Sequence, residues 1–231
     1  MIRKSDVEHW ASWLTRAHEP ALTALLVVEV VVIFVLVPLA GMSVYAAGSA
    51  QVPLASLVAV VAVAAIARGR GALALTFLAA VIGVVVNVLS YAHPSALSAS
   101  AYLFAMLAFL SILTGVVSKV VFGPGQVTWH RVRGAIVLYL HLALIFTFLQ
   151  AVVLFFAPGA FGEALVATDA SAGEKLLYFS FTTLTTVGYG DIVPVHPFAR
   201  SLANLEAMLG QFFPATLLAR VVTLAVAARR E

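Results

Sequence analysis

The chain has 231 residues, of which 63% are hydrophobic and only 10% are charged. A soluble domain cannot bury that much apolar surface, because a folded protein still needs a polar exterior, so the composition predicts a membrane protein. The absence of cysteine excludes disulfides, thiolate metal sites and thiol catalysis. The net charge of +3 does not indicate nucleic-acid binding, because the Lys and Arg residues lie between apolar segments and form no single basic patch.

Long apolar segments define the predicted architecture. A helix needs about 20 apolar residues to cross the hydrocarbon core of a bilayer. Six segments are candidates, although the second is short: Ala21–Leu39, Val52–Ala67, Ala72–Leu89, Ala101–Ser118, Gly134–Ala157 and Ser201–Ala228. We therefore expect an all-α membrane protein with six transmembrane helices.

The positive residues predict how these helices are oriented. Lys175 and Arg200 fall on one side of the predicted spans, and eleven others fall on the opposite side. These eleven are Arg3, Lys4, Arg16, Arg68, Arg70, Lys119, Arg131, Arg133, Arg220, Arg229 and Arg230. Positive loops stay inside, so both termini are expected in the cytoplasm and the protein in the plasma (inner) membrane.

Two short segments flank the first four spans, which we expect to form one domain over residues 21–122. Residues 1–20 carry Trp10 and Trp13 on one helical face, which fits an interfacial helix on the inner leaflet or a loosely ordered tail. Residues 123–133 are expected to form a linker, either a linker helix or an anchor to anionic headgroups.

The segment between the fifth and sixth spans differs from the rest. Ser171–Glu174 matches a capping box, which predicts a helix over residues 172–185. That helix would be about 21 Å long, too short to cross, so it must enter the membrane and return. Non-helical backbone at membrane depth is tolerated only where it is buried in protein or lines water. The sequence therefore predicts a pore after this helix.

The residues that follow carry the most specific motif. Thr186–Gly190 reads TVGYG, and in this it resembles the potassium channel family, whose selectivity filter has this sequence. Rings of uncharged carbonyl oxygens can replace the hydration shell of a potassium ion. Gly188 and Gly190 permit the positive φ that such a backbone needs.

The resemblance implies roles for the neighbouring residues. The ion sites would be formed by the backbone carbonyls of Thr186, Val187, Gly188 and Tyr189 within a filter over residues 186–190. The side chains of Val187 and Tyr189 would brace the filter against the preceding helix, and Asp191 would add negative potential at the outer mouth. Thr185 ends the pore helix, whose C-terminal partial negative charge favours a cation. Tyr178 and Phe179 stand where many relatives carry a tryptophan pair, a departure that bears on filter stability.

One filter copy per chain predicts assembly. A filter uses four such loops, so the resemblance implies a homotetramer in contact with membrane lipids, with a regulatory subunit left open. No cofactor is expected beyond permeant potassium.

The last span, expected over residues 199–228, contains candidate gating residues. Gly210 and Pro214 predict a hinge, and the alternative is that Gly210 only permits close packing. Buried ionisable residues within spans are functional candidates. We expect Glu206 to support the filter from behind. Glu29 is either functional or a satisfied helix contact, and His141 is expected to be a packed, hydrogen-bonded histidine.

The first four spans resemble a voltage-sensing domain in number and position. A sensor needs a row of arginines in the fourth span, and Lys119 is the only charge there, so strong voltage gating is not expected.

Other classes fit less well. No nucleophile–base pair, metal-spaced histidine cluster or phosphate loop indicates an enzyme. A potassium uptake transporter subunit would carry four unlike filter repeats in one long chain. A non-selective cation channel is the nearest rival, although such relatives usually alter the tyrosine or second glycine of the filter, which Tyr189 and Gly190 here preserve.

Overall fold

The structure is a computed structural model that describes residues 22–42, 70–123, 129–166 and 171–227. The first helix starts at residue 22, becomes π-helical at η1 (Val32–Leu36) and ends as α2 (Val37–Met42). The remaining elements are α4 (Arg70–Ala92), α5 (Ala96–Val121), α6 (Trp129–Phe156), the 3-10 turn η2 (Gly162–Ala164), α7 (Ala172–Leu184) and α8 (Pro197–Ala227). The described residues contain no strand, which confirms the predicted all-α class for this part of the chain.

Four of the described helices are long and apolar enough to cross a membrane. They are Leu22–Leu39, Gly71–Ser90, Ala96–Val121 and Arg131–Phe156. These helices correspond to four of the six predicted spans. The predicted second span, Val52–Ala67, lies outside the described residues. The sixth falls on α8, which has 31 residues but is not among those four, so the six-span arrangement stays a prediction.

The structure corrects the predicted start of the fifth span. α6 begins at Trp129 and not at Gly134, so the second half of the predicted linker 123–133 is helical. No proline or glycine separates Trp129 from Gly134, and nothing in the sequence therefore breaks the helix there. The other ends differ by one or two residues, within the usual fraying of helix termini: α6 ends at 156, α7 at 184, and α8 spans 197–227.

The turn between α4 and α5 is set by local hydrogen bonds. Pro94 follows α4 and disfavours helical geometry at the residue before it. Ser95 then caps α5, because its side chain accepts from the Ser98 N–H at 3.1 Å, and the Ser98 hydroxyl oxygen accepts from the Ser95 N–H at 3.0 Å. This reciprocal pair satisfies two otherwise free donors and makes α5 run antiparallel to α4.

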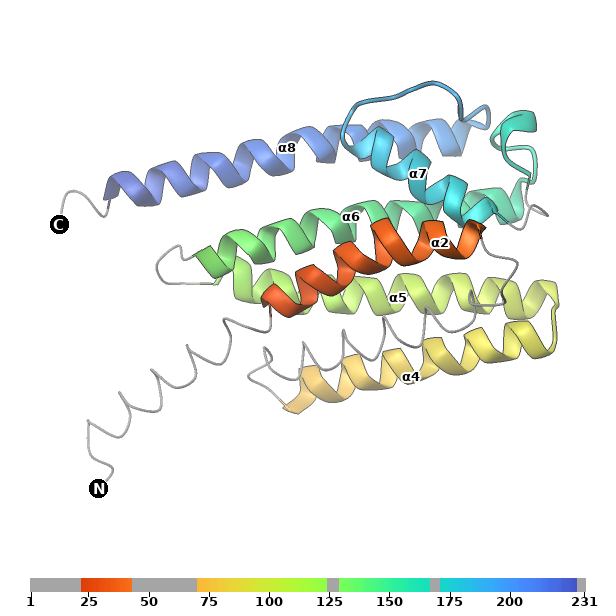
Figure 1. Cartoon of the computed structure of the whole chain (residues 1–231), viewed down its shortest axis with the longest axis horizontal. Helices are drawn as coiled ribbons and strands as arrows, with labels where there is room; N and C mark the ends of the chain where they lie inside the picture. The colour runs from red at the N-terminus through yellow and green to blue at the C-terminus, as the bar shows by residue number, and fades with distance from the viewer. Residues whose placement is uncertain (1–21, 43–69, 124–128, 167–170, 228–231) are drawn as a thin grey trace.

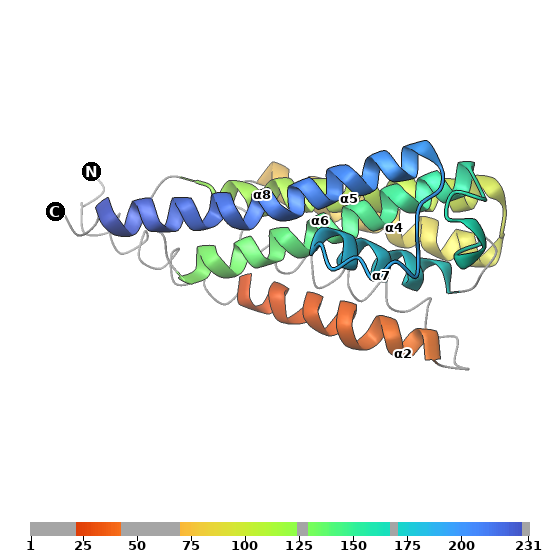
Figure 2. The same cartoon turned by 90° about the horizontal axis from the view of Figure 1, so that it is seen from above.

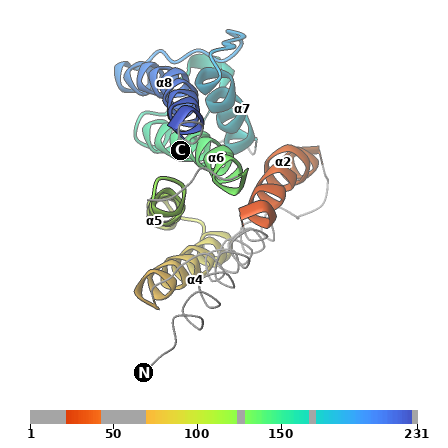
Figure 3. The same cartoon turned by 90° about the vertical axis from the view of Figure 1, so that its left-hand side faces the viewer.

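Helix α6 is the centre of the assembly. It contacts α5 on one side and both α7 and α8 on the other, while α4 contacts α5. Viewed end on, α6, α7 and α8 form one group, and α5 lies between that group and α4 (Figure 3). Seen from above, the helix that ends in α2 lies along the side that carries α7 (Figure 2), and α2 touches α7.

One direct contact joins the first helix to α7. The Phe34 ring, in the π-helical turn, lies 5.4 Å from the Phe181 ring between centroids, edge to face at 63°. Edge-to-face aromatic pairs are favourable beyond their buried area. The first helix therefore packs on the short helix as well as on α6.

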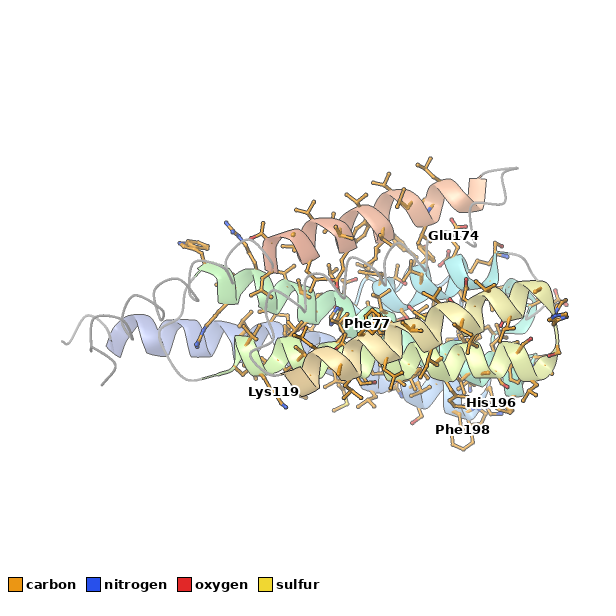
Figure 4. All side chains as sticks on the ribbon, turned by 90° about the horizontal axis from the view of Figure 1, so that it is seen from below. Phe77, Lys119, Glu174, His196 and Phe198 are labelled. Carbon is orange, nitrogen blue, oxygen red and sulfur yellow. The ribbon has the colours of Figure 1, made fainter. Side chains whose placement is uncertain are left out.

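The two ends of the bundle differ in charge. The described start of the first helix, the start of α4, the end of α5, the start of α6 and the end of α8 all lie at one end (Figure 1). Lys119 lies toward that end, and Glu174, His196 and Phe198 lie toward the other (Figure 4). Arg133 also anchors the Lys119 end, because its Nη1 donates to Thr23 Oγ1 at 2.8 Å. This arrangement agrees with the sidedness predicted from Lys and Arg.

Gly134 is the tightest point between α6 and its neighbours. A Cβ atom there would lie 2.6 Å from Val121 Cγ2 and 3.4 Å from Leu22 Cδ1. Gly134 is buried, and both contacting side chains belong to the main core. The glycine therefore allows α6 to approach α5 and the first helix closely.

We predict that Gly134→Ala destabilises the protein by about 1–3 kcal/mol, because overpacking forces the backbones apart. Thermal unfolding of the detergent-purified protein measures the change. The matched control is Gly115→Ala on α5, where an added Cβ meets nothing within 4 Å. The control should be neutral or slightly stabilising, and an equal loss in both variants would contradict this account of Gly134.

Candidate functional site

The candidate site begins with the short helix α7. It has 13 residues, so it is about 20 Å long and cannot cross a bilayer by itself. Its buried residues, Leu176, Phe179, Ser180 and Leu184, face the neighbouring helices. Ser171 stands at the N-cap as expected, but its side chain makes no capping hydrogen bond. The predicted capping box is wrong in this respect because Ser171 has φ −91° and ψ 5°, outside the extended geometry that a capping side chain needs.

The chain reverses at the end of α7 and is fastened to the helix it has just left. The Thr182 carbonyl accepts from the Val187 N–H at 2.9 Å and from the Gly188 N–H at 3.1 Å. The Thr183 carbonyl accepts from the Thr186 N–H at 2.9 Å. Carbonyls in the last turn of a helix have no partner within it, so the loop satisfies them. Figure 1 shows the loop returning from α7 to the start of α8.

Positive φ falls on every second residue of this loop. The values are 59° at Thr186, 55° at Gly188 and 80° at Gly190. Alternation of left- and right-handed residues turns successive peptide groups the same way, which a regular strand does not do. Among the described residues, Thr186 is the only non-glycine with positive φ. A β-branched residue is strained there, and such strain persists where the surroundings hold it and is common at functional sites.

The loop is open to its surroundings. All residues from Thr185 to Asp191 are exposed, and Tyr189 is 71% exposed. This side of the loop is therefore not covered by the described part of the chain.

Tyr178 and Phe179 hold the loop through different contacts. The Tyr178 ring stacks on Tyr189, with centroids 6.1 Å apart and an angle of 4° between the planes. Its hydroxyl lies near the Asp191 carboxylate. Phe179 is buried and packs edge to face on Phe161 at 5.2 Å. Tyr178 thus braces the loop, and Phe179 braces the segment that leads into α7.

The segment that leads from the loop back to α8 is hydrogen-bonded to the turn that follows α6. The Ala160 carbonyl accepts from the Val195 N–H at 2.8 Å and from the His196 N–H at 3.2 Å. Arg200 Nε donates to the Pro194 carbonyl at 2.9 Å. These bonds fix both ends of the loop, so its shape does not depend on α7 alone.

Helix α8 lies directly against the end of α7 at Gly210. A Cβ atom at Gly210 would collide with the Leu184 carbonyl, which also accepts from the Tyr139 hydroxyl at 3.3 Å. The close-packing alternative for Gly210 is therefore supported. α8 runs unbroken through Gly210 and Pro214, and Pro214 offers no N–H to the Gly210 carbonyl. Their role as a gating hinge stays a prediction.

The structure adds one residue that the sequence analysis missed. Gln211 Nε2 donates to Thr186 Oγ1 at 2.8 Å, which joins α8 to the first residue of the loop. A polar amide directly after a glycine, within a predicted span, was the available signal. The motif itself could not reveal it, because the two residues are 25 positions apart.

Glu206 is fully buried on α8. The Ser180 hydroxyl of α7 is its nearest polar partner, but neither carboxyl oxygen completes a hydrogen bond of good geometry. A buried carboxyl without bonds is costly, so this position is constrained. Glu206 lies beside α7, where the sequence analysis expected it to act, and its role in supporting the filter stays a prediction.

A second polar cluster joins the first helix, α5 and α6. His141 is fully buried, and its Nε2 lies 2.6 Å from Glu29 Oε1. Its Nδ1 lies 3.1 Å from Thr114 Oγ1, and the Thr114 hydroxyl donates to the Leu110 carbonyl at 2.7 Å. Because the hydroxyl hydrogen of Thr114 is already donated to Leu110, the N–H at Nδ1 of His141 is the donor to Thr114 Oγ1. The contact between Nε2 and Glu29 then contains one proton, which the two groups share. The predicted packed, hydrogen-bonded histidine is confirmed, and Glu29 is its partner.

In the part of the chain that the structure describes, no group of three or more His, Cys, Asp or Glu side chains could hold a metal ion.

Comparison with known proteins bears on the C-terminal half. Residues 135–227 match a family model described as "Ion channel", a range that covers most of α6, all of α7, the loop and α8. The chain is also 47% identical over 49 residues to Protein LctB of Geobacillus stearothermophilus. That match covers 21% of this chain and only 36% of the relative. Together with the apolar helices, the family match supports an ion channel subunit in a membrane.

We predict that Gly210→Ala destabilises the contact between α7 and α8, because its Cβ has no space beside the Leu184 carbonyl. The expected loss of unfolding free energy is about 1–3 kcal/mol or more, measured by thermal unfolding in detergent. Gly173→Ala on α7, where an added Cβ meets nothing within 4 Å, is the control. Unchanged unfolding of Gly210→Ala would show that this contact is looser than described.

We also predict energetic coupling between Glu29 and His141. His141→Leu should cost about 1–3 kcal/mol, because it leaves the Glu29 carboxyl without its partner. The double variant Glu29→Leu/His141→Leu should recover part of that loss, since neither unpaired group remains. Thr147→Val is the control, because that buried hydroxyl bonds only the Ala143 carbonyl of its own helix. Additive losses in the double variant would argue against a bonded pair.

Proposed function

We propose that this protein is a subunit of a potassium-selective channel that conducts potassium passively through a tetrameric pore. The observation that carries the proposal is the Thr186–Gly190 loop, in which positive φ recurs at every second residue beside the end of a short helix. This geometry supports successive carbonyls turned to one side, as a row of ion sites requires. In the proposal the carbonyls of Thr186, Val187, Gly188 and Tyr189 hold the ions.

Selectivity is supported by how firmly the loop is held. Its first residues are bonded to the last turn of α7, and Tyr178 stacks on Tyr189. A loop fixed on both sides keeps its oxygens at set positions, which favours one ion size or coordination over another. The C-terminal end of α7 adds partial negative charge and favours a cation. In this proposal Thr185 links that end to the filter.

Assembly into four subunits is supported by what one chain leaves open. The filter residues are exposed, and α8 presents Leu205, Met208 and Phe212 at 47%, 54% and 58% exposure. One loop cannot surround an ion, whereas four form closed rings of carbonyls. We propose that other copies of the chain cover the open side of the filter and that lipid covers the remaining apolar surface.

The proposed setting is the plasma membrane, with six spans and both termini in the cytoplasm. The loop after α7, and Glu174 at the start of α7, lie toward the end of the bundle opposite Lys119 (Figures 1 and 4), which supports a filter near the outer surface. In α5 the basic residue of the last turn is Lys119, with no row of arginines before it, so opening is proposed to be largely independent of voltage.

We predict that Gly188→Ala abolishes potassium selectivity, because an alanine at φ 55° is strained by about 1–2 kcal/mol in each subunit. The measurement is the reversal potential of the purified protein in a planar bilayer with potassium and sodium opposed. The wild type should reverse near the potassium equilibrium potential, and the variant should reverse near zero or carry no current.

Gly162→Ala is the matched control, since Gly162 also has positive φ, 62°, but lies outside the filter. It should lose some stability and keep its selectivity. A wild-type reversal potential near zero with robust current would favour a non-selective cation channel over the proposal.

A further inference from the structure

The bond between Gln211 and Thr186 links α8 to the loop of the proposed filter. Gln211 is exposed on α8, and its amide Nε2 lies 2.8 Å from Thr186 Oγ1. Thr186 is the innermost residue of the filter motif. The contact therefore joins the pore-lining helix to the innermost ion site of the proposed filter.

The hydrogen bond determines how the Thr186 hydroxyl is presented. Because Gln211 donates, one lone pair of Oγ1 is occupied, and the hydroxyl hydrogen and the other lone pair must point elsewhere. A threonine hydroxyl rotates freely unless a partner fixes it. Gln211 thus fixes which way the only side-chain oxygen of the Thr186–Gly188 stretch faces.

The backbone of Thr186 also needs this support. Its φ of 59° is unfavourable for a β-branched residue. The Thr186 N–H is bonded to the Thr183 carbonyl of α7 at 2.9 Å, and the side chain is bonded to α8. Thr186 is therefore held from two helices, and the bond from Gln211 is the one that depends on α8.

The stretch of α8 that carries Gln211 packs closely on α7 and lacks one backbone hydrogen bond of its own. Gly210 rests on the Leu184 carbonyl with no room for a side chain. Pro214 removes the N–H that would bond the Gly210 carbonyl, so the helix can bend here at low cost. A bend in this stretch shifts Gln211 relative to Thr186, because Thr186 stays bonded to α7.

We propose that Gln211 is a positioning residue for the innermost ion site: it orients the Thr186 hydroxyl and couples that site to the position of α8. This inference rests on the proposed function. It makes the inner end of the filter responsive to movement of α8, through a single side chain that the filter motif does not contain.

The test is a double-mutant cycle read out as the sodium-to-potassium permeability ratio from reversal potentials. Gln211→Met keeps the length of the side chain and removes the donor, and Thr186→Val removes the acceptor. Gln211→Met should raise the ratio about two- to tenfold, the range expected for one lost hydrogen bond. In the Thr186→Val background, Gln211→Met should add no further change.

Two controls keep the result interpretable. Thr216→Ser alters an exposed side chain on α8 whose hydroxyl donates to carbonyls of its own helix, and it should leave the ratio unchanged. Thr186→Ser keeps a hydroxyl, so Gln211→Met should raise the ratio in that background as well. The thermal stability and assembly of Gln211→Met should match the wild type, because Gln211 is exposed.

The outcomes separate this inference from the proposed function. A selective wild type with an unchanged ratio in Gln211→Met overturns the inference alone, as does a full additional effect in the Thr186→Val background. A wild type that conducts without selectivity overturns the proposed function and the inference with it.

Discussion

The structure depends on how the carbonyl groups at the C-terminal end of α7 are satisfied. The last carbonyls of a helix have no partner within the helix, and each must find one elsewhere. Here the Thr182 and Thr183 carbonyls take the N–H groups of the following loop. The Leu184 carbonyl takes the Tyr139 hydroxyl and packs on Gly210. The loop, α6 and α8 are therefore all positioned by the same turn of helix.

A few polar side chains connect the helices of this apolar chain. Several polar side chains join elements that hydrophobic packing alone would hold only loosely, because apolar side chains pack against lipid nearly as well as against one another. Gln150 donates to the Ala199 carbonyl at 3.3 Å and ties α6 to the start of α8. His141 ties α6 to Glu29 and Thr114, and Gln211 ties α8 to the loop. The polar contacts specify which helices are neighbours, and the apolar cores provide the contact area.

The helices outside the pore region are not a detached domain. The first helix touches α7 through Phe34 and Phe181, and it is bonded to α6 through Glu29 and His141. Because α6 in turn contacts α7 and α8, a displacement of the first helix reaches the candidate filter through two packed elements. π-helical turns such as η1 often occur at functional positions, and this one carries the Phe34 contact. These contacts connect the outer helices to the candidate filter loop through packed elements.

The sequence by itself determined that the protein lies in a membrane, that its elements are α-helices and where the filter motif stands in the chain. Those features follow from local properties: apolar length defines a span, and glycine at 188 and 190 permits the backbone that the motif needs. The predicted start of α6 was Gly134 and not Trp129, because a search for apolar segments does not detect polar helical residues such as Arg131 and Arg133. The Ser171 cap failed because a capping pattern does not fix the φ and ψ of its first residue. Only the tertiary structure decided that Gln211 meets Thr186, that Glu29 meets His141 and that Gly210 rests on Leu184. Each of those pairs joins residues far apart in the chain, and their contact depends on helix packing, which no local pattern encodes.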